Sequence, residues 1–429
     1  MSTICAISTA KGGAIGIIRT SGPDAIRITD SIFRGRKKLS ESKPYTLNFG
    51  QIIDERAEDC EVIDEVLVSI FHGPHSYTGE DSTEISCHGS QYILQRIIEL
   101  LINNGCELAK PGEYTQRAFL NGKIDLSQAE AVADLIASQN KSTHRIALQQ
   151  LRGGYSNKLK HLRNQLLEMT SLLELELDFS EEDVEFAERE KLINLAEKIN
   201  DEISRLTESF RLGNALKNGV PVAIIGAPNV GKSTLLNALL HEDKAIVSDI
   251  KGTTRDLIED TITIDDITFR FIDTAGIRHT NDTIELLGIE RSIRAAEKAQ
   301  IIILMREPGV EYPNIDISDD QTVIYIDNKT DEFQALHGIG IVELERKLVD
   351  AVAKDRDDDF LVTNMRHFEA LSHAGVDIKR AIDSLKMDLS GDIVSEDLRQ
   401  CLFHLGEILG NITSDEVLGN IFANFCIGK

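Results

Sequence analysis

Hydrophobic residues follow two different patterns along the chain. Short apolar runs at residues 66–71, 222–225, 267–272 and 301–304 are typical of buried β-strands. Elsewhere, apolar residues recur at spacings of three and four, which predicts the buried faces of amphipathic helices. Three such series are Leu159, Leu162, Leu166, Met169 and Leu173; Leu192, Leu195, Ile199, Ile203 and Leu206; and Leu398, Leu402, Leu405, Leu409 and Ile412.

The order of these patterns predicts an α/β protein of several domains. Residues 1–120 hold four prolines, many glycines and short β-rich runs, which favours a mixed α/β domain. Proline is then absent until after residue 220, and helical periodicity dominates. Helices on both sides of the strand-rich middle indicate a unit inserted into a helical domain. We expect boundaries at 1–120, 121–217, 218–355 and 356–429.

Residues 226–233 read Gly-Ala-Pro-Asn-Val-Gly-Lys-Ser, between an apolar run and a helix-like run at 234–240. This is the setting of a phosphate-binding loop, whose glycines let backbone N–H groups surround a phosphate. Lys232 can reach the outer phosphates, and the hydroxyl of Ser233 can bind Mg²⁺. Alone, the motif indicates only a nucleoside triphosphatase.

Three further boxes follow in order, at residues 252–256, 273–276 and 328–331. Thr254 can reach Mg²⁺ from a switch loop, while Asp273 can hold a water of that ion. Asp331 can accept two hydrogen bonds from a guanine ring, and adenine would leave buried polar groups unpaired. Alone, residues 328–331 would be read as a polar turn, but after the other boxes they indicate guanine recognition. The four boxes together indicate a GTPase.

Composition and charge narrow the remaining possibilities. The chain has 429 residues, 41% of them hydrophobic, and no apolar run approaches the ~20 residues that span a bilayer. Its N-terminus lacks the layout of a secretory signal, so we expect a cytoplasmic protein without a membrane segment. The six cysteines show no Cys-x-x-Cys spacing, which predicts neither a disulfide framework nor a zinc site.

The formal net charge of −25 indicates how the chain could interact with nucleic acid. A protein that grips nucleic acid through its own surface is expected to have a basic face. If RNA is the substrate, another subunit should carry much of the positive charge. The acidic stretch at residues 174–190 is either a solvated face or a binding surface, and the first is the commoner case.

Several separate motifs resemble the tRNA-modifying GTPases of the MnmE (TrmE) family, and the resemblance covers nearly the whole chain. Residues 425–429 read Phe-Cys-Ile-Gly-Lys and are similar to the Cys-x-Gly-Lys tail of that family. Further similar motifs lie at residues 17–23, 77–81, 87–89, 111–114, 117–123 and 178–183. The resemblance implies an N-terminal folate-binding and dimerisation domain, a helical domain and an inserted Ras-like P-loop G domain.

The resemblance also implies a site for a one-carbon tetrahydrofolate, either 5-formyltetrahydrofolate or methylenetetrahydrofolate. Its binding residues carry over to Arg19, Glu84 and Lys123, with Lys429 from the tail. These residue types suit the ligand, because a pterin offers an amino edge to a carboxylate and a glutamyl tail to cations. Cys426 is either a nucleophile in one-carbon chemistry or a packed C-terminal cysteine.

The mechanism of GTP hydrolysis should differ from that of Ras-like switches. Those proteins place a glutamine directly after the box that corresponds to residues 273–276. Here Ile277 follows, and an aliphatic side chain cannot orient water. The resemblance assigns catalysis to Glu285 and supplies the missing positive charge as K⁺. Asn229 matches the family's K⁺ ligand, and Ser248, Ile250 and Thr253 belong to the switch segment that should wrap the ion.

The boxes and the resemblance together give a nucleotide-binding set, with Mg²⁺ on Ser233 and Thr254. The set is Asn229, Val230, Gly231, Lys232, Ser233, Thr234, Ser248, Thr253, Thr254, Asp273, Thr274, Ala275, Gly276, Asn328, Lys329 and Asp331. The family reaction installs an aminomethyl or carboxymethylaminomethyl group on the wobble uridine of tRNA. The resemblance implies a homodimer that works with the FAD- and NADH-dependent partner MnmG (GidA) in a heterotetramer, with the tRNA held largely by that partner.

The chain departs from the family pattern in three places. Residues 8–11 replace prolines before the glycine turn, and Met305-Arg306-Glu307 replaces the usual strand ending with an aspartate after the run 301–304. Only residues 332–334 separate Asp331 from 335–338, which we interpret as the remnant of the SAK-like guanine box. Two alternatives stay open: a ribosome-assembly GTPase, and a folate-dependent one-carbon enzyme with a vestigial G domain.

Overall fold

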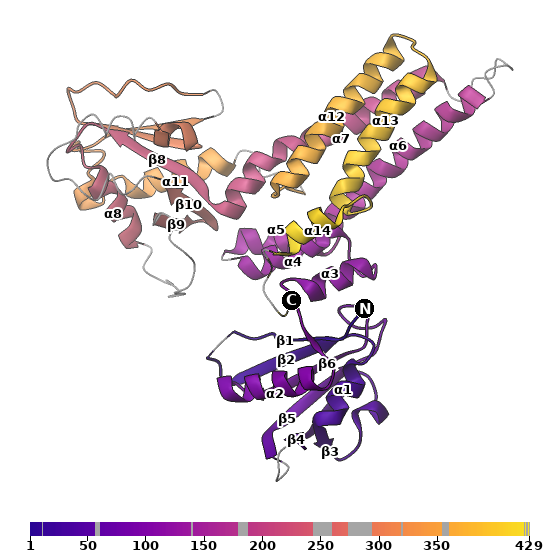
Figure 1. Cartoon of the computed structure of the whole chain (residues 1–429). Helices are drawn as coiled ribbons and strands as arrows, with labels where there is room; N and C mark the ends of the chain where they lie inside the picture. Colours follow the sequence, from indigo (N-terminus) through magenta and orange to yellow (C-terminus); the bar gives the residue numbers. More distant parts are fainter. Residues whose placement is uncertain are drawn as a thin grey trace. The chain divides into compact units, whose positions relative to one another are not determined.

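The structure is a computed structural model that describes most of the chain. The described residues are 1–10, 12–55, 61–138, 140–178, 188–242, 260–272, 294–318, 321–353, 360–423, 425 and 428. They form two compact units, each described separately below (Figure 1). The first unit comprises Met1–Ile136, Gln150–His161 and Leu405–Lys429, and the second comprises Ala137–Gln149 and Leu162–His404.

The first unit is built on a seven-stranded sheet in the order β3-β4-β5-β6-β2-β1-β7. All neighbouring strands are antiparallel except β1 and β7, which are parallel. Its elements are β1 (Ile4–Ile7), β2 (Ile15–Ser21), α1 (Ala25–Ile32), β3 (Phe33–Gly35), η1 (Leu39–Glu41), β4 (Leu47–Asp54), β5 (Glu61–Phe71), β6 (Ser82–His88), α2 (Gln91–Asn103) and β7 (Glu107–Leu108). This confirms the predicted mixed α/β character and the strand at residues 66–71.

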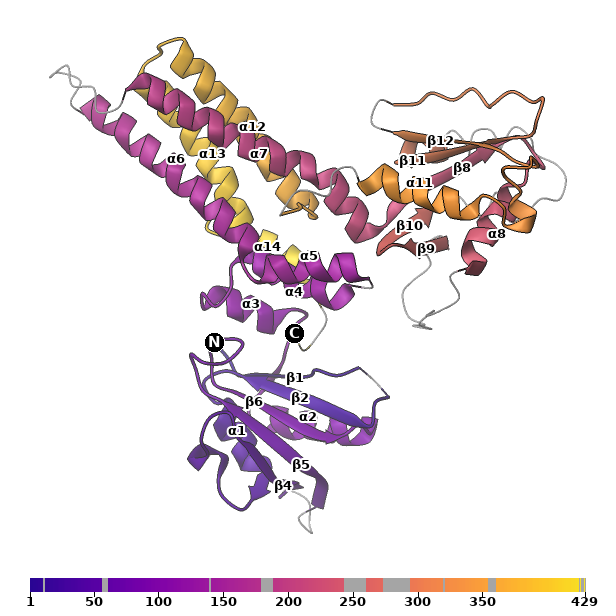
Figure 2. The ribbon, with the colours of Figure 1, turned by 180° about the vertical axis from the view of Figure 1, so that it is seen from behind.

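The two faces of this sheet differ. Helices α1 and α2 cover one face, as the opposite views in Figures 1 and 2 show. There Ile18, Ile85 and Val68 are fully buried, because side chains of alternate residues point to the same side of a strand. The other residues point to what we call the outer face, which exposes Ile15, Leu47, Phe49 and Leu67.

The first unit is completed by helices from distant parts of the sequence. They are α3 (Glu113–Leu120), α4 (Leu126–Ala137) and α14 (Asp415–Ala423), with the first turns of α6 (Gly154–Asp178). Leu126 and Ala129 of α4 pack against Leu418 and Phe422 of α14 in a small core. The C-terminal segment is therefore held within the same unit as the N-terminal sheet.

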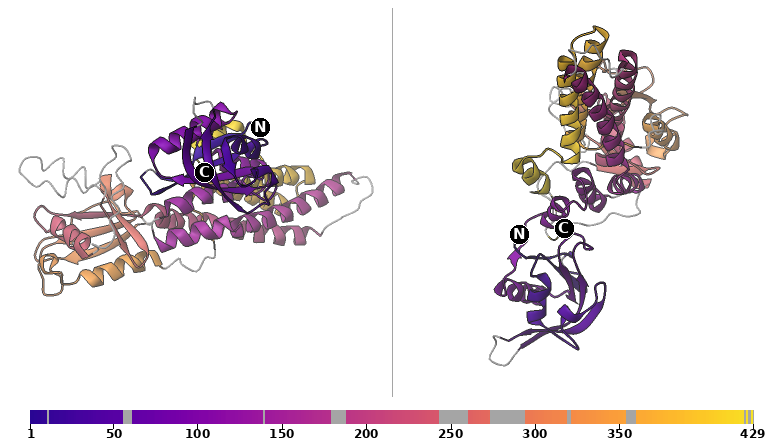
Figure 3. Two further views of the ribbon diagram at one scale, coloured as in Figure 1. Left: turned by 90° about the horizontal axis from the view of Figure 1, so that it is seen from below. Right: turned by 90° about the vertical axis from the view of Figure 1, so that its right-hand side faces the viewer.

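Long helices make up much of the second unit, where they run alongside one another in every view (Figures 1, 2 and 3). They are α6, α7 (Arg189–Asn218), α12 (Met365–Lys386) and α13 (Gly391–Leu409), with α5 (Lys141–Leu151) nearby in sequence. The predicted apolar series are confirmed, since nearly all their members are buried. Leu195 is only partly buried, and Ile412 is exposed: α13 ends at Leu409, Gly410 adopts φ 82°, and Ile412 is 42% exposed. None of the described helices is long and apolar enough to cross a bilayer.

Between α7 and α12 the chain forms a five-stranded sheet in the order β12-β11-β8-β10-β9. All neighbours are parallel except the antiparallel pair β9 and β10. The elements are β8 (Val220–Gly226), α8 (Lys232–Glu242), β9 (Asp260–Ile264), β10 (Ile267–Phe271), β11 (Ile301–Arg306), β12 (Thr322–Asp327), η3 (Ala335–His337) and α11 (Ile341–Ala353). Helices α8 and α11 and the end of α7 pack on one face, and the helical residues 294–298 pack on the other.

This sheet stops at β12 within the described residues. After Asp331 the chain makes a single β-bridge between Gln334 and Ile339, passes through η3 and enters α11. Residues 307–318, between β11 and β12, contain no helix. Because only residues 332–334 separate Asp331 from the segment 335–338, no described strand follows β12 in the sheet. β12 is therefore an edge strand whose only described strand neighbour is β11.

Candidate nucleotide and folate sites

The phosphate loop follows the central strand of the five-stranded sheet. Residues 227–231 connect β8 to α8, which confirms the strand–loop–helix setting predicted from the sequence. Asn229 has φ 62° and Gly231 has φ 101°, so the backbone passes twice through the left-handed region. A Cβ atom at Gly231 would lie 2.4 Å from Nδ2 of Asn328, so a larger residue would push these two segments apart.

The ammonium group of Lys232 is held by the phosphate loop. Its Nζ donates to the carbonyl oxygens of Gly226 at 2.8 Å and Ala227 at 2.9 Å. Burial lowers the pKa of Lys232, because desolvation penalises the charged form. Ser233 and Thr234 follow in the first turn of α8, where backbone N–H groups favour anions. The loop therefore offers the donors and the cation that a phosphate group needs.

Asn328 ties the guanine box to this loop. Its side chain is 4% exposed; Nδ2 donates to the carbonyl of Val230 at 2.7 Å, and Oδ1 accepts from the N–H of Ala335 at 3.1 Å. Ala335 begins η3, in the segment interpreted as the SAK-like remnant. One buried side chain thus joins three segments that the sequence pattern assigned to nucleotide binding.

The rest of the guanine box is more exposed. Lys329 has φ 64° and forms an ion pair with Glu307, which follows the end of β11. The N–H of Thr330 donates to the carbonyl of Phe333 at 3.1 Å, which closes a turn around Asp331. Asp331 itself is exposed, as a base-recognising carboxylate at the mouth of a site should be.

Many predicted residues lie outside the described part of the chain. These are Ser248, Ile250, Thr253, Thr254, Asp273, Thr274, Ala275, Gly276, Glu285, Cys426 and Lys429. Of the two predicted Mg²⁺ ligands, only Ser233 is therefore described. Among the described residues, no group of three His, Cys, Asp or Glu side chains is arranged to hold a metal ion.

A second polar cluster lies on the outer face of the seven-stranded sheet. Arg19 of β2 and Glu84 of β6 are direct partners in the strand register. The Nε and Nη2 atoms of Arg19 donate to the same oxygen of Glu84, at 2.9 and 2.7 Å. Both side chains are only about a quarter exposed, at 23% and 27%. The predicted folate residues Arg19 and Glu84 are thus in direct contact.

Two tyrosines surround the guanidinium group of this pair. The rings of Tyr77 and Tyr114 each have their centroid 5.7 Å from the Arg19 Cζ atom. The hydroxyl of Tyr114 donates to the Arg19 carbonyl at 2.7 Å, and burial raises the pKa of Tyr77. A cation flanked by aromatic faces is a suitable surface for a planar, polar ring.

The C-terminal tail reaches the same cluster. The carbonyl of Gly428 accepts from the Ser8 hydroxyl at 3.2 Å and from Nη1 of Arg19 at 3.5 Å. Gly428 has φ 92°, and a Cβ atom there would lie 2.5 Å from the carbonyl oxygen of Ile7. The tail is therefore fitted closely to the end of β1, next to Arg19.

Lys123 is joined to the cluster indirectly. Its Nζ donates to the Pro74 carbonyl at 2.8 Å, and the side chain of Asn121 donates to the Thr78 carbonyl at 2.7 Å. Both contacts are with the loop that carries Tyr77. The structure places Lys123 against this loop, away from direct hydrogen bonding with the arginine–glutamate pair among the described residues.

Two family models match the chain. The model of the GTP-binding protein TrmE N-terminus matches residues 3–123, and the model of the MnmE helical domain matches residues 126–426. The chain belongs to the MnmE (TrmE) family. The helical-domain match begins before the five-stranded sheet and ends after it, so both helical segments belong to one family domain.

Curated relatives resemble the chain over its whole length, and each is named tRNA modification GTPase MnmE. A protein of Bacteroides thetaiotaomicron is 56% identical over 465 aligned positions, which cover 100% of this chain and 99% of the relative. Proteins of Bacteroides fragilis and Phocaeicola vulgatus are 55% and 54% identical with the same coverage. The alignments are longer than 429 residues, so these MnmE proteins contain residues that this chain lacks.

Several residues at the two sites were not assigned a role from the sequence. Tyr77 and Tyr114 stand in two of the motifs that resemble MnmE, which was the available signal. Ser8 and Arg306 lie in two of the departures from the family pattern. Ser8 donates to the Gly428 carbonyl, and Arg306 forms an ion pair with Asp327. The departures were therefore as informative as the matches.

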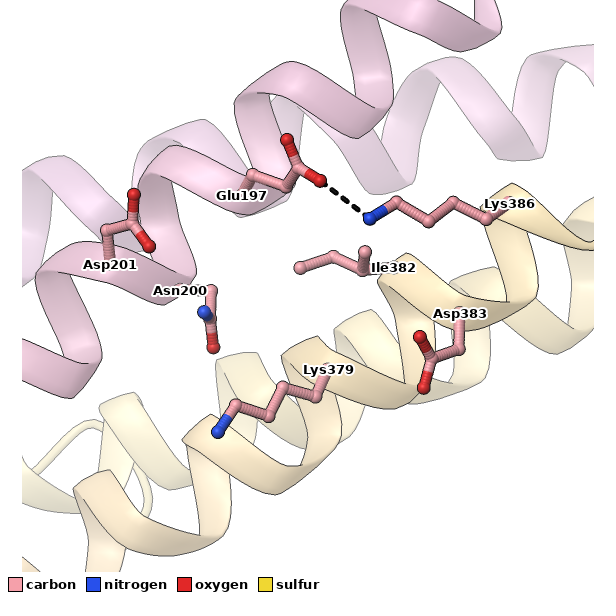
Figure 4. Close-up of a pocket in the computed structure, with 7 residues that line it drawn as sticks. All are labelled: Glu197, Asn200, Asp201, Lys379, Ile382, Asp383 and Lys386. Carbon is pink, nitrogen blue, oxygen red and sulfur yellow. Dashed lines mark ion pairs between the residues drawn. The ribbon is translucent and has the colours of Figure 1, made fainter.

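A hollow of about 450 Å³ lies between α7 and α12 (Figure 4). It is lined by Glu197, Asn200, Asp201, Lys379, Ile382, Asp383 and Lys386. Glu197 and Lys386 form an ion pair of 2.7 Å across it, which Figure 4 marks. Its lining contains none of the predicted MnmE site residues.

Proposed function

We propose that the chain is a K⁺-stimulated GTPase that modifies the wobble uridine of tRNA together with an FAD- and NADH-dependent partner, MnmG (GidA). The added group is aminomethyl or carboxymethylaminomethyl, with a tetrahydrofolate as the source of one carbon. Family membership makes the chain a GTPase of tRNA modification. The observation that carries the guanine-nucleotide part of the proposal is the Asn328 side chain, which connects the phosphate loop to the guanine box.

The five-stranded sheet region is the inserted G domain in this proposal. Its support is a parallel sheet with the phosphate loop after the central strand, lying between two stretches of one helical-domain match. Lys232 binds the outer phosphates, and Asp331 accepts from the guanine edge. Ser233 and Thr254 would hold Mg²⁺, which would neutralise phosphate charge.

Glu285 is the proposed catalytic residue that orients the attacking water, since Ile277 cannot do so. Asn229 would hold K⁺ at the phosphate loop, together with Ser248, Ile250 and Thr253. Asn229 is exposed and has φ 62°, a backbone geometry that asparagine tolerates better than most residues. The cation compensates charge that develops on the phosphates.

The K⁺ proposal is tested by GTP turnover at equal ionic strength in KCl and in NaCl. We expect faster turnover in KCl, and we expect Asn229→Ala to remove most of the difference. Asn218→Ala, an exposed asparagine at the end of α7, is the matched control. Equal turnover of the wild-type chain in the two salts would refute the role of the ion.

The folate proposal rests on the pair formed by Arg19 and Glu84. Glu84 would accept from the amino edge of a pterin, and Arg19, Lys123 and Lys429 would bind anionic parts of the ligand. The bound folate supplies the carbon that is transferred, and Cys426 is a proposed nucleophile near that carbon. The flanking tyrosines and the fitted tail support a ligand site here.

The folate proposal is tested by binding of 5-formyltetrahydrofolate to the purified chain. We expect Arg19→Ala to weaken binding by about tenfold or more, because a hydrogen bond to a charged group contributes roughly 1.5–3 kcal/mol. Arg27→Ala is the matched control, since Arg27 is exposed and pairs only within its own helix region. Unchanged binding in Arg19→Ala would contradict the assignment.

We also propose a homodimer formed through the outer face of the seven-stranded sheet, and a cytoplasmic location. Leu47 and Phe49 are 66% and 64% exposed on that face, and contiguous exposed apolar residues favour association. Sedimentation should show a dimer for the wild type and a monomer for Phe49→Glu. Tyr92→Glu, a change at an exposed ring on α2, should leave the dimer intact.

One alternative has specific support. The five-stranded sheet lacks a strand between β12 and α11 in the described residues, which is the observation behind the second candidate, a folate-dependent one-carbon enzyme with a vestigial G domain. Measurable GTP turnover in KCl, without ATP turnover, would exclude that alternative. Folate binding without any nucleotide binding would support it.

A further inference from the structure

The end of β12 is held to its neighbours by a group of three side chains. Arg306 and Asp327 are the last residues of β11 and β12 and are direct partners in the strand register. The guanidinium of Arg306 donates through both Nε and Nη2 to the Asp327 carboxylate, so that the contact is two-pronged. The hydroxyl of Tyr312 donates to the same carboxylate at 3.0 Å.

Ring contacts extend this group. The Arg306 guanidinium lies 4.2 Å from the centroid of the Tyr312 ring, and Tyr312 meets Tyr325 edge to face at 5.0 Å. Tyr312 belongs to the segment that runs between β11 and β12 without forming a helix. We call Arg306, Tyr312 and Asp327 the Asp327 clamp. It joins the two strand ends and the segment between them.

The guanine box begins at the residue after the clamp. The hydroxyl of Thr330 donates to the Asp327 carbonyl at 3.0 Å, so the clamp and the box share a backbone position. Glu307, next to Arg306, pairs with Lys329 on the other side of Asn328. The last residue of β11 and the residue after it therefore hold the residues that flank Asn328.

The edge position of β12 explains why such a clamp is needed. Its only described strand neighbour is β11, so its last residues lack the second ladder that would fix a central strand. Asp331 is exposed and lies four residues after the last residue of this strand. Because hydrogen bonds weaken steeply with poor geometry, small movements of this strand end would change how Asp331 meets a base.

We propose that the Asp327 clamp positions Asp331 and thereby sets the preference for guanine. Arg306 is the principal positioning residue, and the arginine–glutamate pair of residues 306–307 does in this chain what a longer guanine-box region would do by packing. The inference rests on the proposed function, since it needs a chain that binds guanine nucleotides. It predicts a loss of base discrimination rather than a general loss of nucleotide binding.

Binding of GDP and IDP distinguishes these two effects. Hypoxanthine keeps the ring N–H of guanine and lacks its exocyclic amino group, so the ratio of the two affinities reports how well Asp331 reads that group. We expect Arg306→Ala to reduce the ratio by about 3- to 10-fold, the range of one ordinary hydrogen bond. The affinity for IDP should fall less than that for GDP, because hypoxanthine makes only one of the two contacts with Asp331 and the phosphate loop is untouched.

Three further variants sharpen the test. Arg306→Lys should not restore the ratio, because a lysine cannot bind both carboxylate oxygens in a fork. Tyr312→Phe keeps the ring and removes one hydrogen bond, so it should reduce the ratio of GDP to IDP affinity by about 2-fold. This variant tests the clamp even if Arg306→Ala does not fold. Arg346→Ala removes a more exposed ion pair, on α11, and should leave the ratio unchanged.

The outcomes separate the inference from the function on which it rests. If the wild type binds neither nucleotide, the proposed function fails and takes the inference with it. If the wild type prefers GDP and Arg306→Ala keeps the same ratio, only the inference fails. An equal loss of both affinities would also overturn it, because it would show a structural role for the clamp without a role in reading the base.

Discussion

The two sheets present their polar side chains in different ways. In the seven-stranded sheet, Arg19 and Glu84 face each other on adjacent strands, and the strand ladder fixes their distance. In the five-stranded sheet, Asp331 and Lys329 lie on a loop beyond a strand end and depend on single contacts. The first site is arranged by regular backbone, and the second by side chains that tie loops together. Changes to single residues should therefore act more sharply on the nucleotide site.

The largest effect is expected at Lys232. Its ammonium is held by two phosphate-loop carbonyls, and Lys232→Ala removes the only cation that the described loop provides. GTP turnover should fall by about 100-fold or more, the scale of losing a group that stabilises the transition state. Folate binding should stay unchanged. Lys198→Ala, at an exposed position on α7, is the control, and turnover within 3-fold of wild type in Lys232→Ala would contradict the assignment.

A variant of Asn328 tests the connection between the phosphate loop and the guanine box. Asn328→Ala removes the bond to Val230 and leaves the buried N–H of Ala335 without its acceptor. Leaving a buried group unsatisfied costs about 1–3 kcal/mol, so we expect GDP and IDP to bind about tenfold more weakly, and to the same extent. Competition titrations measure both. A change in GDP alone would show that Asn328 acts on the base and not on the loop.

The nucleotide site could be predicted from the sequence more directly than the folate site. The phosphate loop and the guanine box are continuous motifs, so residues such as Lys232 and Asn328 were assigned before any fold was known. The pair of Arg19 and Glu84 spans 65 residues and was found only through the family resemblance. No local pattern reveals which strands become neighbours, since register depends on the whole sheet.

The remaining contacts arise from tertiary packing. The Asp327 clamp joins ordinary residue types, and the only signal of it in the sequence was the departure from the family pattern at residues 305–307. The helical series predicted α6, α7 and α13 because one buried face repeats along each helix. The end of α13 was missed because apolar spacing continued to Ile412 past Gly410, whose left-handed backbone stops the helix.

A smaller effect is expected at the C-terminal tail, in the first region. Gly428→Ala places a Cβ atom 2.5 Å from the Ile7 carbonyl at a φ of 92°. The tail should move away from Arg19, and 5-formyltetrahydrofolate should bind a few-fold more weakly while GDP binding stays the same. Gly419→Ala, where a Cβ atom meets nothing within 4 Å, is the control. Equal folate affinity in the two variants would show that the tail does not support this site.

The smallest effect concerns pH. Hydrogen bonds from Arg306 hold the pKa of the Asp327 carboxyl below its usual range. A carboxyl with a lowered pKa in the folded state stabilises the fold above its unfolded pKa, about 3.9, and this stabilisation is lost as the pH falls through the folded value. Asp327→Asn should therefore lower the melting temperature slightly at pH 7, and the difference should vanish in strong acid. A difference that grows on acidification would contradict the clamp.

Calorimetric titration with two ligands tests the central claim most directly, namely that one chain holds a guanine-nucleotide site and a separate folate site. The account predicts that the wild type binds both GDP and 5-formyltetrahydrofolate. Lys232→Ala should keep only the folate, and Arg19→Ala only the nucleotide. Absence of heat with both ligands in the wild-type chain would contradict the account.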